Sequence, residues 1–380
     1  MIVEAVENQC EAWDRFVHEN ADSRGPHLSG WKQVIEKTFS HHCYYLAARE
    51  GDRWRGLLPL THLRSKLFGS FLVSVPYLNY GGIVADSEAA RQALYERAVA
   101  LARQLRVAHV ELRHETALLP HLPTKQHKVA MLLELPDTSE LLLQGFKAKL
   151  RSQIRKPQKE GLTYRCGREQ ELDSFYQVFV TNMRDLGTPV YSRRFFANIL
   201  AAFPERAHIC TVYRGEQPLA AGFVFGFRQT LEIPWASSLR EFNALAPNML
   251  LYWAVLEFAI QQGYKFFDFG RSTPNEGTYK FKEQWGARPV PLHWQYWLAN
   301  GATTLPDLSP HNAKYQMAIQ IWQRLPLAVT RLVGPAIVKN IRDHRSTPDS
   351  FLQRAAWSSS FGCVSVSSFG SMLVTRFCFG

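Results

Sequence analysis

Apolar and polar residues in the first third of the chain follow an order that predicts a small α/β unit. The apolar runs predict strands at residues 43–50, 53–63 and 71–76, then a helix at 87–105 and a strand at 109–113. The first two strands meet at Gly51-Asp52, which is a typical hairpin turn. Ser87 is a good N-cap for the helix that follows.

A later segment repeats the same order of predicted elements. Strands are predicted at residues 208–215, 217–227 and 230–234, followed by a helix at 247–262 and a strand at 265–270. The hairpin turn is now Gly215-Glu216, and the helix starts with Pro247 and stops at Gly263. The repetition predicts a duplicated α/β fold with mixed sheets.

The repeat suggests a division of the 380-residue chain. We expect a first domain, a basic connecting helix, a second domain, C-terminal helices and an unassigned tail, at residues 1–138, 139–161, 162–300, 301–345 and 346–380. Helices at 171–186 and 192–202 are expected to cover one face of the second sheet. The C-terminal helices are expected to break at Pro326 and at Gly334-Pro335.

The amino-acid composition narrows the class of protein. The net charge of +11 fits either an ordinary basic surface or a polyanionic partner such as tRNA, a nucleotide carrier or an anionic membrane. The six cysteines include no CxxC pair, which predicts no disulfide framework and no metal site. The first residues lack the pattern of a signal peptide, so a cytoplasmic location is expected.

The densest positive cluster lies in the predicted connecting helix. Lys147, Arg151 and Arg155 recur every four residues and form one stripe, before Pro157 is expected to end the helix. Such a stripe can bind the phosphates of tRNA. The alternative is a solvated helix that only joins the two domains.

Residues 267–287 concentrate the groups that an acyl-transfer site would use. Asp268 is expected on the sheet face opposite Phe267 and Phe269 because side chains alternate along a strand. Arg271, at the end of that strand, is placed to bind a phosphate or a carboxylate. The alternative for Asp268 is a structural brace bonded to Arg271 or to the backbone.

Several of these stretches resemble the FemAB-like branch of the GNAT superfamily. The resemblance rests on Ile154-Arg155-Lys156 in the basic helix, and on Gly277, Phe281-Lys282 and Trp285-Gly286 in the later block. It covers roughly residues 34–298 and implies tandem GNAT-like acyltransferase domains with a C-terminal helical extension. The sequences PYLNYGG at 76–82 and FDFGRS at 267–272 are similar to the subgroup associated with PEP-CTERM/exosortase and exopolysaccharide systems.

The resemblance also implies roles for individual residues. It places Lys282 where the acyl group meets the acceptor amine, and a lysine there would stabilise the developing oxyanion. The alternative is a surface lysine over Trp285. The candidate catalytic residues are therefore Lys282, Asp268 and Arg271, and the candidate substrate-binding residues are Tyr77, Asn79, Tyr80, Asn275, Tyr279, Lys280, Phe281 and Trp285.

The donor is left open between aminoacyl-tRNA and acyl-CoA, with no tightly bound cofactor. A CoA-dependent GNAT enzyme normally has a glycine-rich turn before the central helix, but here the turn reads SSLREFNALAPN. The expected function is acyl or aminoacyl transfer to an amine of a cell-envelope precursor, either a peptidoglycan-type peptide or an exopolysaccharide sugar. The alternatives are an acyl-CoA-dependent N-acyltransferase on an amino sugar and a non-catalytic subunit of a polysaccharide assembly system.

The C-terminal helices combine apolar and basic residues. Docking on the second domain is one interpretation of this pattern. The other is a basic amphipathic segment resting on the inner face of an anionic membrane, which would suit a lipid-linked acceptor.

Overall fold

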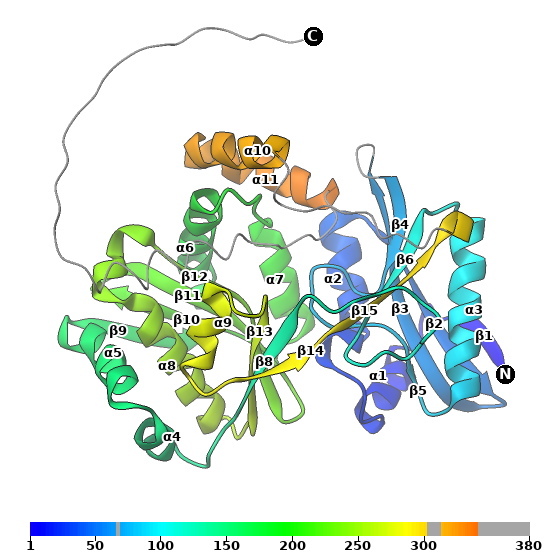
Figure 1. Ribbon diagram of the computed structural model, residues 1–380, viewed down its shortest axis with the longest axis horizontal. Coiled ribbons are helices and arrows are strands. Elements are labelled where there is room, and N and C mark those ends of the chain that lie inside the picture. The colour runs from blue at the N-terminus through cyan, green and yellow to red at the C-terminus, as the bar shows by residue number, and fades with distance from the viewer. Residues whose placement is uncertain (66–68, 302–312, 341–380) are drawn as a thin grey trace, which may run out of the picture.

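Two mixed sheets, each with helices on both of its faces, form the body of the described structure (Figure 1). The computed structural model describes residues 1–65, 69–301 and 313–340. Within these residues, no helix is both long enough and apolar enough to span a membrane.

The first sheet has eight strands in the order β1-β2-β3-β4-β6-β15-β7, with β5 paired to β3. The strands are β1 (Ile2–Ala5), β2 (His42–Glu50), β3 (Arg53–Ser65), β4 (Gly69–Val73), β5 (Val84–Ala85), β6 (His109–His114), β7 (Thr124–Lys125) and β15 (His293–Leu298). Only β4 and β6 run parallel among the pairs of this sheet's described strands.

The second sheet has seven strands in the order β14-β8-β13-β12-β11-β10-β9. The strands are β8 (Val129–Glu134), β9 (Leu162–Gly167), β10 (Ala207–Arg214), β11 (Gln217–Phe227), β12 (Thr230–Ser238), β13 (Phe266–Ser272) and β14 (Arg288–Pro291). Here β12 and β13 are the parallel pair among the described strands.

The predicted duplication is confirmed. The series β2, β3, β4, helix α3 (Glu88–Gln104), β6 is repeated by β10, β11, β12, helix α8 (Pro247–Gln261), β13. In each series the third strand pairs in parallel with the last one, across the helix. Within these pairs Glu111 faces Val73 and Asp268 faces Glu232, so Glu111 and Asp268 occupy corresponding positions.

The two sheets exchange a strand, which the sequence did not predict. Strand β8 precedes the expected boundary at residue 138 but lies in the second sheet, between β14 and β13. Strand β15 follows most of the second unit but lies in the first sheet, between β6 and β7. The expected limits at residues 138 and 161 therefore do not coincide with a division between the sheets.

Helices from both halves of the chain share one apolar core between the sheets. Helices α1 (Cys10–Glu19) and α2 (Gly30–Phe39) meet α6 (Leu172–Asp185) and α7 (Arg193–Ala202) there. On the outer face of the second sheet lies α8, against α5 (Ala148–Lys159) and next to α4 (Ser139–Gly145). Almost every position of α8 is apolar because it is covered on both sides, whereas α3, at the first sheet's outer face, keeps a polar side.

An arginine also joins the two halves. Arg228, in the turn after β11, donates hydrogen bonds to carbonyls at the C-terminal end of α1 and just beyond it. The acceptors are the carbonyl oxygens of Val17, His18, Asn20 and Ala21. A cation at these carbonyls satisfies groups that the helix leaves unpaired and complements its dipole.

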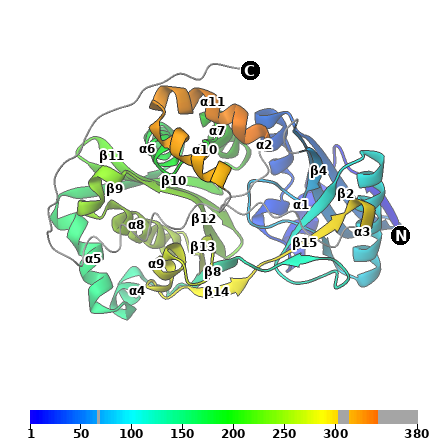
Figure 2. The same cartoon turned by 45° about the horizontal axis from the view of Figure 1, so that its top comes forward.

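The remaining helices are short or lie at the outside. Helix α9 (Gly277–Glu283) follows β13, and the pair α10 (Ala313–Arg324) and α11 (Leu327–Asn340) packs on α6 (Figures 1 and 2). The predicted break at Pro326 is confirmed, but α11 continues through Pro335. A proline within a helix removes one backbone hydrogen bond, and the preceding residue, Gly334, packs closely against Val190.

Two further expectations need correction. Helix α5 does not end at Pro157 but continues to Lys159, and Gly161 then turns the chain at φ 78°. A disulfide joins Cys166 of β9 to Cys210 of β10, although none was predicted. These residues are 44 positions apart in the chain but face each other in the antiparallel register, which spacing alone does not reveal.

Candidate active site

The second sheet opens where its two parallel strands diverge. Strands β12 and β13 pair over only three residues each, ending at Glu232 and Asp268. Beyond that point β12 follows β11 to Ser238, while β13 follows β8 to Ser272. The gap between the two strand ends contains a cavity of about 260 Å³, which α6, α8 and α9 close from the sides.

The cavity has an apolar lining with polar groups at defined positions. Its apolar surface comes from Phe179, Met183, Leu186, Ile233, Pro234, Trp235, Ala236, Leu251, Tyr252, Phe269 and Phe281. Its polar lining includes Asn79, Lys128, Asn182, Thr188, Ser237, Ser238, Asn243, Asn248, Arg271, Ser272, Thr278 and Lys282. A cavity that combines apolar walls with convergent polar groups can hold a small molecule or an acyl group.

Two carboxylates are buried at the point of divergence. Glu232 and Asp268 face each other across the parallel pair. Burial raises the pKa of Glu232 to about 8, and the neighbouring charge of Asp268 adds to this shift. Burial also raises the pKa of Asp268, although its hydrogen bonds from Tyr80 and from the amide of Gly270 oppose the shift.

The two carboxylates differ in the hydrogen bonds that they accept. Asp268 accepts from the Tyr80 hydroxyl on one oxygen and from the Gly270 amide, at 2.7 Å, on the other. Glu232 accepts from the Asn79 side-chain amide at 3.0 Å, and its second oxygen accepts no hydrogen bond from the described residues. Both oxygens of Asp268 thus accept hydrogen bonds, one of them from the backbone as the alternative interpretation expected, whereas one oxygen of Glu232 accepts none from the described residues.

Lys282 is buried in the wall of the cavity, so it is not a surface lysine. Its ammonium group donates to the carbonyl oxygens of Gly270 and Arg271, both at 3.0 Å. Only 7% of the residue is exposed, and its charge acts on both buried carboxylates by lowering their pKa. Gly270, at φ 73°, turns the backbone so that these carbonyls face Lys282.

Arg271 stacks on an aromatic ring of the other sheet. Its guanidinium lies 4.9 Å from the ring centre of Trp294 in β15, and Arg113 of β6 lies 4.3 Å from the same ring. Arg113 is also paired at 2.8 Å with Glu111, which corresponds to Asp268 in the first unit. In the first unit, the corresponding carboxylate is thus neutralised by an arginine.

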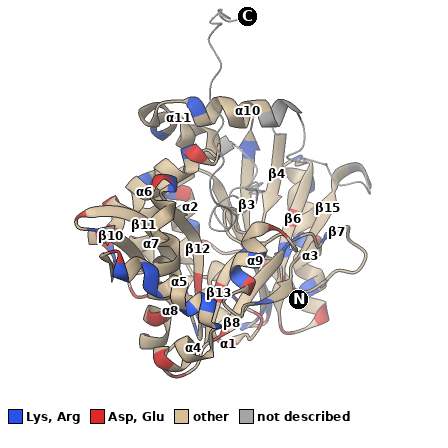
Figure 3. Cartoon of the chain, turned by 60° about the vertical axis from the view of Figure 1, so that its left-hand side comes forward, with Lys and Arg blue, Asp and Glu red and all other residues tan. Residues whose placement is uncertain are grey.

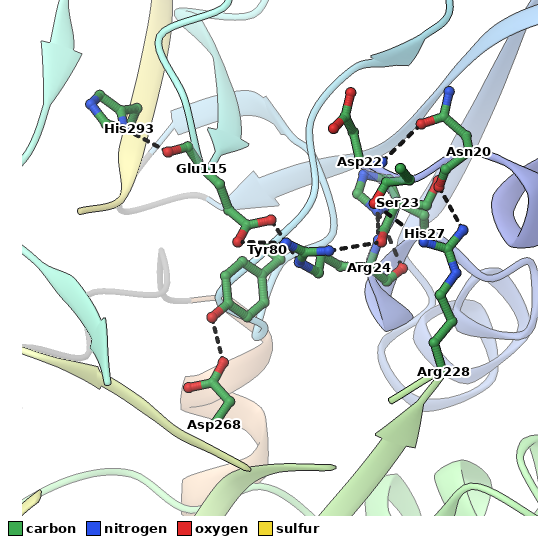
Figure 4. A network of polar contacts seen from close by, with 11 residues as sticks. Asn20, Asp22, Ser23, Arg24, His27, Tyr80, Glu115, Arg228, Asp268 and His293 are labelled. Atoms are coloured by element: carbon green, nitrogen blue, oxygen red, sulfur yellow. Dashed lines mark hydrogen bonds and ion pairs between the residues drawn. The ribbon is translucent and has the colours of Figure 1, made fainter. Parts of the chain in front are cut away.

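The loop at residues 76–82 reaches from the first unit to the carboxylates. Asn79 contacts Glu232 across the boundary between the sheets, and Tyr80 contacts Asp268 in the same way. Figure 4 shows the contact of Tyr80 with Asp268. The loop is conformationally unusual, since Val75 and Tyr77 have φ values of 52° and 73°. Backbone strain of this kind is often found at functional sites.

A second group of charges surrounds this contact. Arg24 forms an ion pair at 2.7 Å with Glu115, whose backbone carbonyl accepts a hydrogen bond from His293 (Figure 4). Burial raises the pKa of Glu115, and the nearby Arg24 opposes that shift. Asp268 and Glu232 therefore lie in a buried, interconnected polar region built by both halves of the chain.

The structure brings only part of the predicted site together. Lys282, Arg271, Asn79 and Phe281 line the cavity, while Asp268 and Tyr80 lie behind it. Five residues lie elsewhere: Tyr77 packs in the shared core, Trp285 is buried under the sheet, Tyr279 packs beside Trp285's cluster, and Asn275 and Lys280 are exposed.

The basic stripe does not line the cavity either. Lys147, at the N-cap of α5, and Arg155, within α5, are exposed. Arg151 donates to the carbonyl oxygen of Phe146, where it caps the end of α4. Lys156, which was not singled out, bonds the carbonyl oxygen of Ala244 at 2.7 Å and so ties α5 to the loop before α8. Arg151 thus has a structural contact, and Lys147 and Arg155 remain candidates for an anionic partner.

Sequence reasoning missed Glu232, although a signal was present. It is a single carboxylate in the apolar run of residues 230–234, and a charge in a buried strand needs a partner or a function. Asn182 and Asn248 were missed as well, because their helices were read for apolar spacing only. Among the described residues, no cluster of three or more His, Cys, Asp and Glu side chains is arranged to hold a metal ion.

The turn before α8 differs from the glycine-rich turn that a CoA-dependent GNAT enzyme normally has. Ala246 adopts the left-handed conformation that a glycine would favour, at φ 54°, and no side chain caps the helix. Asn243 and Asn248 lie on either side of this start and line the cavity. The helix N-terminus, which attracts negative charge, is therefore next to the cavity without a glycine-rich turn.

Comparison with known protein families and solved structures agrees with the observed fold. Residues 144–283 match the sequence model of a family described as an acetyltransferase (GNAT) domain. No curated protein sequence matches the chain.

Among solved structures, FemX is similar with a TM-score of 0.62 and 15% identity over 85% of this chain and 100% of that one. The C-terminal domain of a putative lysylphosphatidylglycerol synthetase from Agrobacterium fabrum gives 0.53 and 13%, over 88% and 98%. A tandem GNAT protein from the clavulanic acid biosynthesis pathway gives 0.50 and 13%, over 80% and 100%.

The fold and the matched domain define the class of protein. The chain is an acyltransferase, and it has the mixed α/β architecture of tandem GNAT proteins. Both predictions are confirmed. GNAT domains use acyl-CoA as donor, whereas the donor and acceptor of this chain are matters for proposal.

Proposed function

We propose that the protein transfers an acyl or aminoacyl group to an amine of a cell-envelope precursor, a peptidoglycan-type peptide or an exopolysaccharide sugar. The observation that carries the proposal is the cavity at the divergence of β12 and β13, with Lys282 in its wall and Glu232 beside it. Asn79 brings the first unit to the same place, so both halves contribute to one site. The structural similarity to FemX and to a lysylphosphatidylglycerol synthetase domain supports an envelope acceptor.

The residues suit the steps of acyl transfer to an amine. The acceptor nitrogen attacks the carbonyl carbon of the donor and must lose a proton, and Glu232 is the base that we assign to this step. With a pKa of about 8, Glu232 is mostly protonated at pH 7 and becomes a carboxylate as the pH approaches 8, so the rate of a reaction that uses it as the base should rise with pH over this range. Lys282 supplies positive charge that stabilises the carbonyl oxygen as that oxygen becomes negative. The bond between the acyl carbon and the sulfur or oxygen of the donor then breaks, and the donor leaves as its thiol or alcohol.

A specific observation favours acyl-CoA as the alternative donor. The uncapped start of α8 next to the cavity suits the phosphates of acyl-CoA, which supports a CoA-dependent N-acyltransferase acting on an amino sugar. The basic residues Lys147 and Arg155, exposed on α5, support aminoacyl-tRNA instead. The association with PEP-CTERM/exosortase systems stays a prediction from the residues at 76–82 and 267–272.

A donor assay with matched variants tests the proposal. We would measure release of free CoA thiol from a panel of acyl-CoAs, and transfer of label from charged tRNA, each with amino-sugar and peptide acceptors. Glu232→Gln and Lys282→Ala are expected to lower kcat by about a hundredfold or more, because each removes a group that acts on the reacting atoms. Lys280→Ala is the control, since Lys280 is an exposed lysine on the same short helix.

The outcome separates the alternatives. Turnover with acyl-CoA alone would remove the tRNA version, and transfer from charged tRNA alone would remove the CoA version. Equal activity of the wild type and the Glu232→Gln and Lys282→Ala variants, with the fold intact, would show that the chemistry lies elsewhere.

A further inference from the structure

Helices α10 and α11 are firmly seated on the body of the protein along one side. Ile319 and Trp322 of α10 and Thr330 and Val338 of α11 are buried. The side chain of Ile319 lies 2.4 Å from the position where a Cβ on Gly187 would be, so only a glycine fits beneath it. These contacts fix which side of each helix faces away from the protein.

The opposite side of the two helices is apolar and exposed. In α10, Met317 and Ile321 are 63% and 57% exposed and lie one helical turn apart. In α11, Leu332 is 79% exposed, and Val329 and Val333, at 39% and 40%, lie beside it. We call these five residues the outer face. Large apolar side chains grouped in this way usually mark an interaction surface.

The charges of this segment all have one sign. Residues 313–340 contain Lys314, Arg324, Arg331 and Lys339 and no Asp or Glu. Arg324 and Lys339 are exposed, and Figure 3 shows basic residues on the two helices. Helical spacing places Arg324 on the same side of α10 as Met317 and Ile321, so basic and apolar groups share one surface.

We infer that the outer face of α10 and α11 binds the surface of an anionic lipid bilayer. Exposed aliphatic side chains flanked only by cations match the chemistry of an interfacial amphipathic segment, in which apolar groups enter the lipid and cations meet the headgroups. Each cation near an anionic membrane contributes about 1 kcal/mol, and the absence of acidic residues leaves no opposing charge in this segment.

The position of the helices gives the contact a consequence for the enzyme. Both helices pack on α6, whose residues Phe179, Asn182 and Met183 line the cavity. Two helix layers, α10–α11 and α6, would therefore separate a membrane at the outer face from the cavity, a distance of about two helix diameters or ~20 Å. A substrate anchored in that membrane would be held close to the site, although binding to the bilayer does not depend on the proposed reaction.

Vesicle flotation with the full-length protein tests the inference. Wild type is expected to float with phosphatidylcholine vesicles that contain about 30% phosphatidylglycerol, to bind pure phosphatidylcholine at least about tenfold more weakly, and to be released at high salt. Leu332→Glu is expected to lower binding to the anionic vesicles by about tenfold or more. Leu141→Glu is the matched control, because Leu141 is an apolar residue of α4 that is 55% exposed far from this face.

A charge variant and a size measurement complete the test. Arg324→Gln combined with Lys339→Gln is expected to weaken binding to anionic vesicles at low salt by about tenfold and to leave neutral vesicles unaffected. Failure of the wild type to prefer anionic vesicles would overturn the inference, as would equal losses for Leu332→Glu and Leu141→Glu. A dimer of the wild type that Leu332→Glu converts to a monomer, seen by light scattering, would show instead that a second copy covers the outer face.

Discussion

Glu232→Gln should change how the stability of the protein depends on pH. In the folded protein the pKa of Glu232 is raised from its ordinary value of 4.5 to about 8, mainly by burial. Between these two values the folded state holds a proton that the unfolded state has released, so stability must fall as the pH rises. Glutamine has nearly the same shape and no charge, and it therefore removes this dependence.

The magnitude follows from the linkage relation. One extra proton in the folded state lowers the free energy of unfolding by about 1.4 kcal/mol for each pH unit. Between pH 6.5 and 8.5 the wild type should thus lose about 2 kcal/mol more than the variant, the loss levelling off above the folded-state pKa. The buried His27, His41 and His114 have lowered pKa values and are neutral in the folded state over this range, and their titration in the unfolded state affects the wild type and the variant equally, so it cancels in the comparison.

Urea unfolding followed by circular dichroism across that pH range is the measurement. Glu216→Gln is the control, since the Glu216 side chain is 92% exposed, and its curve should run parallel to that of the wild type. Parallel curves for the wild type and Glu232→Gln would refute the reasoning, because they would mean that Glu232 ionises in the folded protein as readily as in water.

Two other substitutions probe the contacts that hold the site together. Gly82→Ala should destabilise the protein by about 2–4 kcal/mol and reduce activity, because the new Cβ would lie 2.2 Å from the His114 ring and displace the loop that carries the site residues. Gly51→Ala, also at positive φ but in open space, should cost about 1 kcal/mol in the same urea experiment, and an equal cost at both sites would exclude the ring contact as the cause. Arg228→Ala should lower the free energy of unfolding by about 2 kcal/mol, because several carbonyls lose a charged donor. Arg214→Ala, at the exposed opposite end of the β10–β11 hairpin, should cost less than about 0.5 kcal/mol, and similar values for the two would contradict the assignment.

The repeated core of the fold could be predicted from the sequence because it depends on local signals. Hairpin turns such as Gly51-Asp52 and Gly215-Glu216, and the apolar spacing of α3, identify strands and helices without reference to distant residues. The exchange of β8 and β15 could not be predicted in this way. Both strands pair with partners more than 100 residues away, and the pairing depends on which edges remain open in the folded sheets.

The site was predicted where the residues are clustered and missed where they are dispersed. Lys282, Arg271 and Asp268 lie in one short block, so their concentration was visible. Glu232 is 36 positions before Asp268, and only the parallel pairing of β12 with β13 places the two side chains together. Conversely, Tyr77 and Trp285 have the composition of a binding surface, but burial in the apolar cores decided their position.

The strand exchange has a consequence for synthesis of the protein. Strand β15 lies between β6 and β7 but is not made until residue 298, long after the other strands of the first sheet. As the chain leaves the ribosome, the edge of β6 must therefore wait with unpaired backbone groups while nearly 200 further residues are added. The first sheet is completed only after residue 298 has been made, and a chain that stops before β15 would expose that edge to other nascent proteins.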